Sequence, residues 1–170
     1  MPPISSPPKQ LLQFLKPYDP AIRDLALKLR VRVLEELAPC HESIWDAYNA
    51  VALGYGLSGR LKDNVCHIAV YAGHVDLGFN QGAHLADPRG ILEGDGRNIR
   101  HMTIATPADL ARPAIREYLR RARAFSDGSI PAPKSVISTV KGDYPTRRRP
   151  GSSGTNPASP APRRRSSRKA

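Results

Sequence analysis

Two runs of alternating residues, separated by Ala-Gly, constrain the fold of this chain more than any other feature. Apolar side chains occupy every second position in residues 65–71 and again in residues 74–79. Successive side chains of a strand point to opposite faces of a sheet, and a two-residue loop can join antiparallel strands. We therefore predict a β-hairpin, and its apolar face pairs Val70 with Val75, Ile68 with Leu77, and Cys66 with Phe79.

The other face of this hairpin collects His67, Tyr71, His74 and Asp76, and His101 lies on a strand expected nearby. Cross-strand neighbours on one face are close enough for their side chains to converge. Imidazole and carboxylate groups bind divalent metals, and His67, His74 and Asp76 are the candidate ligands. The same side chains could instead hold a small ligand, contact a partner protein, or form an ordinary solvated sheet face.

The remaining patterns predict helices on either side of further strands. Residues 21–37 show a helical apolar stripe, and a short helix capped by Ser6 ends near residue 15. Residues 51–56 and 100–105 alternate like strands, and a helix capped by Thr106 runs to residue 125. We predict an α+β fold: an antiparallel sheet with helices packed on one face.

Charge divides the chain into a body and a tail. Residues 1–130 hold 16 basic and 14 acidic side chains, whereas residues 131–170 hold 10 basic and 1 acidic. We expect a flexible arm over residues 1–10, a folded domain over 11–126, and a disordered Pro/Ser/Arg-rich tail over 127–170. Arginine triplets in such a tail could bind nucleic acid or another polyanion without base specificity, and the candidates are Arg147, Arg148, Arg149, Arg163, Arg164 and Arg165.

Three linked motifs follow the hairpin: G-F-x-x-G-A-x-L-x-D-P at residues 78–88, L-x-G-x-G at 92–96, and R-H at 100–101. Together they resemble the bacterial YdhG-like family, known as domain of unknown function 1801, over about residues 10–125. Where many members carry a K-W-G-x-P-like stretch, this chain has D-x-Y-N at 46–49, which marks a separate branch. The resemblance implies a frataxin-like α/β sandwich. It also implies an alternative role, because one branch is described as an intracellular iron chaperone, with iron as its cargo.

Two further segments carry candidate ligand-binding residues. Paired glycines in residues 92–101 could form an anion-binding loop in which Arg97 or Arg100 holds a phosphate or carboxylate, or the loop could be a tight structural turn. Asp46, Tyr48 and Asn49 could line a pocket or cap the turn between helix and sheet. Gly54 and Gly56 leave room for a ligand or another backbone to approach the sheet.

No nucleophile motif such as G-x-S-x-G occurs in the chain, and Cys66 falls on the apolar hairpin face. Neither a signal peptide nor an apolar run of membrane-spanning length is visible. We therefore expect a cytoplasmic, non-enzymatic module without a membrane anchor, which binds a small ligand or a protein through the open face of its sheet.

Overall fold

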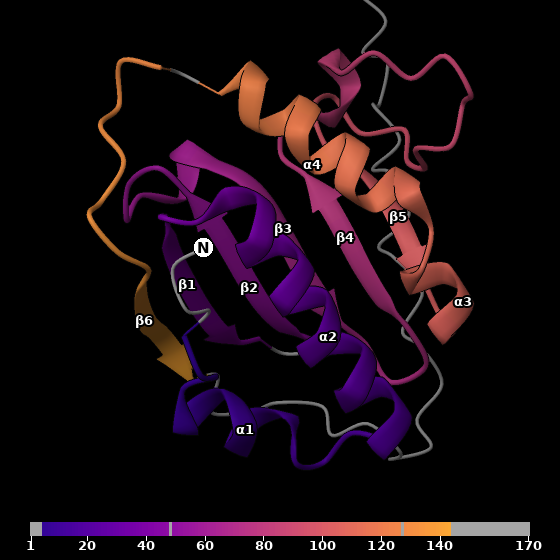
Figure 1. Cartoon of the computed structure of the whole chain (residues 1–170). Coiled ribbons are helices and arrows are strands. Elements are labelled where there is room, and N and C mark those ends of the chain that lie inside the picture. Colours follow the sequence, from indigo (N-terminus) through magenta and orange to yellow (C-terminus); the bar gives the residue numbers. More distant parts are fainter. Residues whose placement is uncertain (1–4, 48, 127, 144–170) are drawn as a thin grey trace, which may run out of the picture.

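A computed structural model of the chain describes residues 5–47, 49–126 and 128–143. The helices are α1 (Lys9–Leu15), α2 (Pro20–Leu37), α3 (Pro107–Leu110) and α4 (Pro113–Phe125), with short 3-10 turns η1 (Leu61–Asp63) and η2 (Gly82–His84). The strands are β1 (His41–Asp46), β2 (Val51–Gly56), β3 (Asn64–Val70), β4 (Val75–Phe79), β5 (Arg100–Ile104) and β6 (Ile137–Asp143). They form one sheet in the order β5-β4-β3-β2-β1-β6, with α2 and α4 against one face (Figure 1).

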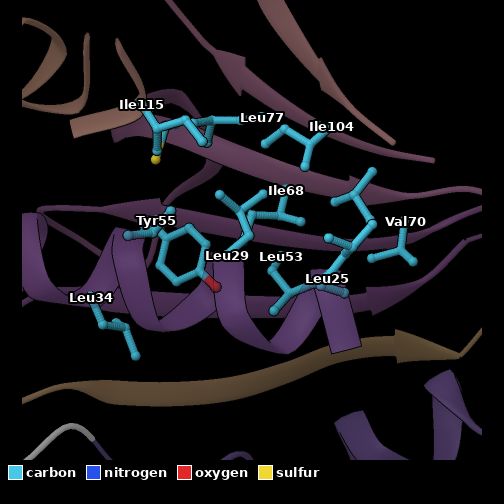
Figure 2. Close-up of a cluster of buried hydrophobic side chains, with 14 of the residues drawn as sticks. Leu25, Leu29, Leu34, Leu53, Tyr55, Ile68, Val70, Leu77, Ile104 and Ile115 are labelled. Carbon is cyan, nitrogen blue, oxygen red and sulfur yellow. The ribbon is translucent and has the colours of Figure 1, made fainter. Parts of the chain in front are cut away.

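This arrangement confirms the predicted α+β fold with helices on the sheet. The face under the helices carries the core, where Leu25 and Leu29 of α2 meet Leu53 and Ile68 of the sheet (Figure 2). These four side chains are at most 2 % exposed. No helix in the described part of the chain has both the length and the apolar character that crossing a membrane requires.

The β3–β4 hairpin has the predicted register. Val70 pairs with Val75, Ile68 with Leu77, and Cys66 with Phe79. The Tyr71 N–H donates to the His74 carbonyl at 3.0 Å, which closes the Ala-Gly loop. Since a shift of one residue would turn Val, Ile and Leu side chains toward the open face, burial of one face specifies this register.

Two predicted helix features differ from the structure. The helix expected over residues 107–125 is broken into α3 and α4, because Pro113 has no N–H to donate and Arg112 before it is extended. At the other end, α1 begins at Lys9 after Pro8 and has no side-chain cap, so Ser6 does not cap it. The Thr106 cap is confirmed: Thr106 and Asp109 form a reciprocal capping box.

The sheet contains two strands that the sequence patterns did not predict, β1 and β6. β6 pairs with β1 in parallel, so the sheet is mixed and not wholly antiparallel. The folded unit therefore continues beyond the expected boundary at residue 126, and the expected disorder is wrong for the β6 segment. Composition was misleading there, because the run V-I-S-T-V at residues 136–140, in which four of five residues are β-branched, favours a strand within a Pro- and Ser-rich context.

A buried ion pair holds β6 and the N-terminal segment to the core. Glu42 on β1 and Arg30 on α2 are 0 % and 1 % exposed, and Arg30 donates to both carboxylate oxygens at 2.8 and 3.0 Å. The hydroxyls of Tyr55 and Ser138 donate to the same carboxylate at 3.0 and 2.6 Å. Arg30 also donates to the Ser5 carbonyl at 2.8 Å. This network positions β6 beside β1 and so forms one border of the open sheet face.

Candidate ligand-binding site

The sheet face opposite the helices carries the side chains that the hairpin pattern singled out. Strand pairing places Ser43, Gly54, His67, Gly78 and His101 in one row across β1 to β5. The next row consists of Trp45, Ala52, Ala69, Asp76 and Thr103. Four of the central positions on this face are glycine or alanine, and the His67 side chain lies among them.

At the hairpin turn, Tyr71, His74 and Asp76 form a small polar cluster. The rings of Tyr71 and His74 stack with centroids 5.0 Å apart, and His74 Nε2 lies 3.6 Å from Asp76 Oδ1. The Thr103 hydroxyl donates to the same carboxylate oxygen at 3.1 Å. Partial burial, together with the negative charge of Asp76, raises the pKa of the Tyr71 hydroxyl. The carboxylate is thus already bound by its neighbours.

His67 is held apart from this cluster, nearer the middle of the face. Its ring covers Gly78 so closely that a Cβ at that position would lie 2.3 Å from Cε1 and Nε2. His67 Nδ1 lies 3.0 Å from Asn80 Oδ1. Gly78 and Asn80 together fix where the imidazole lies.

A hollow of about 490 Å³ opens on this face beside His67. The larger apolar side chains that line it are Trp45, Leu61 and Ile99. Leu61 is 64 % exposed and Ile99 is 47 % exposed. The other residues that line it are Asp46, Ala47, Ala52, Gly54, Asn64, His67, Asn80 and Gly142. A mostly apolar concavity of this size with a few polar groups is typical of small-molecule sites.

The two glycines of β2 do not leave the space that the sequence suggested. A Cβ on Gly54 would lie 2.3 Å from Asn64 Nδ2, and one on Gly56 would lie 2.9 Å from Asn64 Oδ1. The Asn64 amide therefore lies over both glycines and forms part of the lining. Because Gly54 and Gly56 have no side chains, the Asn64 amide fits against β2. Gly54 still lines the hollow.

The segment 46–49 contributes one of its three predicted residues to the hollow. Asp46 is buried and lines the hollow. Asn49 is exposed in the turn between β1 and β2, where the Ala47 N–H donates to the Ala50 carbonyl at 2.9 Å. Tyr48 lies outside the described residues.

The glycine-containing loop that precedes β5 is a structural turn. Glu93 and His101 exchange two backbone hydrogen bonds, at 2.8 and 2.9 Å, which close the loop. Arg100 donates to the carbonyls of Gly96 and Ile99, so its guanidinium binds the loop itself. Gly94 has a φ of 110°, a conformation that favours glycine. Arg97 is exposed. These contacts favour the structural interpretation of the loop over an anion-binding site.

No family model, curated protein or solved structure matches this chain.

The geometry also bears on the metal and nucleophile hypotheses. Within the described ranges, no three His, Cys, Asp or Glu side chains form a group that could hold a metal ion. The candidate set His67, His74 and Asp76 does not form such a group. Burial raises the pKa of the Cys40 thiol to about 12 and that of Cys66 well above its ordinary value, so both thiols are poor nucleophiles.

The arginines proposed to bind nucleic acid, at 147–149 and 163–165, lie outside the described residues. Sequence analysis also missed most of the lining of the hollow. Leu61, Asn64, Asn80, Ile99 and Gly142 come from separate loops and strand ends. Of the residues that line the hollow, the sequence had indicated Asp46, Gly54 and His67, and the open face was expected from the polar side of the hairpin.

Proposed function

We propose that this protein is a non-enzymatic binding module that holds a small molecule in the hollow of its open sheet face. The observation that carries the proposal is the lining itself. The hollow has a volume of about 490 Å³, Trp45, Leu61 and Ile99 supply its apolar walls, and His67 lies beside Asn80. Few polar groups in an apolar concavity orient a ligand while the apolar surface provides most of the affinity.

The volume of the hollow, about 490 Å³, lies in the range of small-molecule sites. Leu61 and Ile99 are exposed at the hollow, so a ligand seated there would remove their apolar surface from water. Such burial contributes roughly 25 cal/mol per Å². The resemblance to the YdhG-like family belongs to the same proposal and is compatible with a cytoplasmic module. We do not extend it to iron, because the described residues offer no metal-binding group.

Trp45 makes the proposal directly testable. It lines the hollow and is the only tryptophan of the chain, so intrinsic tryptophan fluorescence reports on this site alone. We expect a screen of small molecules to find ligands that shift the Trp45 emission. A ligand present at about 100 times its Kd should raise the free energy of unfolding by about 2.7 kcal/mol.

Ala52→Leu is the variant that tests the location. Ala52 lies on the floor of the hollow, and a leucine there would fill the space without entering the core. Ala72→Leu makes the same change at the exposed hairpin turn and serves as the control. We expect Ala52→Leu to weaken binding at least about tenfold and Ala72→Leu to leave it unchanged. Equal binding by both variants would place the ligand elsewhere and overturn the proposal.

A further inference from the structure

We propose that an arginine-lined groove on the helix side of the protein binds a small molecule that carries two or more phosphate or carboxylate groups. The groove and the hollow lie on opposite sides of the sheet, so this second site is independent of the function proposed above. Three observations support it: the size of the groove, its excess of positive charge, and guanidinium groups that are held in place with donors to spare.

The groove has a volume of about 560 Å³ and is formed by α4, the end of α3 and one residue of α2. Figure 1 shows α3 leading directly into α4 beside α2. The residues that line the groove are Arg32, Leu110, Ala111, Arg112, Pro113, Ile115, Arg116, Glu117 and Arg120. Arg112, Arg116 and Arg120 are four residues apart, which places them on one side of α4 at steps of about 6 Å along its axis. A concavity of this volume is in the range of small-molecule sites.

Positive charge exceeds negative charge around the groove. Four arginines and one glutamate line it, and their ion pairs add Glu35, Glu36, Asp109, Arg89 and Arg121. Six arginines therefore meet four carboxylates, which leaves two positive charges unbalanced. An anion with two or more charges would neutralise this excess, whereas an uncharged ligand would not.

Two carboxylates of α2 hold the arginines of α4 in place. Arg116 Nη2 lies 2.8 Å from Glu35 Oε2, and its Nε lies 2.8 Å from Glu36 Oε1. Arg120 donates from Nε and Nη2 to Glu36 at 2.7 and 3.3 Å. The Glu36 side chain is 11 % exposed and that of Arg120 is 66 % exposed, so the guanidinium lies toward solvent and the carboxylate behind it. Fixed guanidinium groups lose less conformational freedom when they bind an anion.

One nitrogen of each guanidinium remains available to a ligand. The contacts of Arg116 and Arg120 with α2 use Nε and Nη2. Arg112 likewise donates from Nε to the Asp109 carbonyl at 3.1 Å and from Nη2 to the Thr103 carbonyl at 2.8 Å. Among the described residues, Nη1 of these three arginines makes no hydrogen bond. Guanidinium groups form strong, charge-assisted hydrogen bonds with phosphate and carboxylate oxygens, so one multivalent anion can bind several of these nitrogens.

Isothermal titration calorimetry of the full chain with tripolyphosphate, citrate and acetate tests the chemical class. Low ionic strength limits screening of the arginines by salt. We expect tripolyphosphate or citrate to bind with one molecule per chain, and acetate, with its single charge, to bind at least about tenfold more weakly than the better of them. The better probe indicates whether the ligand carries phosphate or carboxylate groups. If neither binds more tightly than acetate, the proposal is wrong.

The double variant Arg116→Gln/Arg120→Gln tests the location. Its matched control, Arg147→Gln/Arg148→Gln, removes the same charge from the C-terminal segment, where the sequence predicted polyanion binding. We expect the groove variant to bind the better probe at least about tenfold more weakly and the control to bind it as the unaltered protein does. Equal affinity of the two variants, or a larger loss in the control, would overturn the proposal.

Arg116→Lys/Arg120→Lys provides a second variant in case the first does not fold. Lysine keeps the charges that face Glu35 and Glu36 but lacks the planar guanidinium, so binding should still weaken, and unchanged binding would contradict the role of the arginines. Urea unfolding, followed by Trp45 fluorescence, shows whether each variant is folded. Single-stranded DNA is the last probe: if it binds more tightly than tripolyphosphate and the groove variant abolishes that binding, the groove is a nucleic-acid surface and the small-molecule class is wrong.

Discussion

Removing one member of the buried Arg30–Glu42 pair is expected to destabilise the protein more than removing both. Each residue is at most 1 % exposed, so the remaining charge would have neither solvent nor an oppositely charged partner. Breaking a buried pair in this way typically costs about 3–5 kcal/mol. We expect a loss of this size in the free energy of unfolding for Arg30→Met and for Glu42→Leu.

The double variant should lose much less than the sum of the single losses. With both charges gone, the main remaining cost is the buried Tyr55 hydroxyl, which loses its acceptor on Glu42. An unsatisfied buried hydroxyl costs about 1–3 kcal/mol. Ser138 is exposed, so water can replace its lost hydrogen bond. The two variants should therefore be coupled by at least about 3 kcal/mol in a double-mutant cycle.

Urea unfolding, followed by circular dichroism and by Trp45 fluorescence, measures the four free energies of the cycle. The exposed pair Asp24–Lys28 is the control, because its atoms are also 2.8 Å apart but its side chains are 54 % and 61 % exposed. Its cycle should give at most about 1 kcal/mol. Additive losses at Arg30 and Glu42, equal to those of the control pair, would refute the assignment of a tightly coupled buried network.

Three further outcomes follow from local geometry. Gly78→Ala should displace the His67 ring and lower the free energy of unfolding by about 1–3 kcal/mol in the urea assay. Gly73→Ala is the control: open space surrounds Gly73, so this change should leave the free energy of unfolding nearly the same. Hydrogen bonds from Thr106 and from backbone N–H groups lower the pKa of the Asp109 carboxyl in the folded protein below its unfolded value of 3.8. The stability that the Asp109 carboxylate contributes is therefore present above pH 3.8 and is lost as the pH falls through the lower, folded pKa. Asp109→Asn should therefore flatten the decline in urea midpoint from about pH 5 to about pH 2, and an unchanged decline would contradict this. Both cysteines should resist Ellman's reagent in the folded protein and react in urea, and rapid reaction of the folded protein would contradict their burial.

The elements that sequence analysis predicted correctly are those specified by neighbouring residues. The hairpin register follows from alternation over residues 65–79 and a short loop, and the capping box needs only Thr106 and Asp109, three positions apart. Arg30 also left a local signal, because it lies four residues from the buried Ala26 and Leu34 on the apolar side of α2. A charged residue at such a position requires a buried partner, but the local pattern does not say which residue that is.

The missed features depend on contacts between distant segments. Ser138 donates to Glu42 across 96 positions of the chain, and the parallel pairing of β6 has no turn beside it to indicate a register. The hollow likewise combines residues from β1, β2, β3, η1 and the loop before β5. Hydrophobic periodicity describes which face of one element is buried, but it does not describe the shape that several elements leave between them.

The place of β6 in the chain has a consequence for biosynthesis. The ribosome makes β1 about 90 residues before its parallel neighbour, so β1 lacks that neighbour until Ile137–Asp143 have been synthesised. During this interval the backbone of β1 forms an unprotected sheet edge, and the Glu42 carboxylate lacks Ser138. Nascent chains that stall in this interval are open to pairing with one another, which makes the last strand of the sheet a safeguard against aggregation during translation.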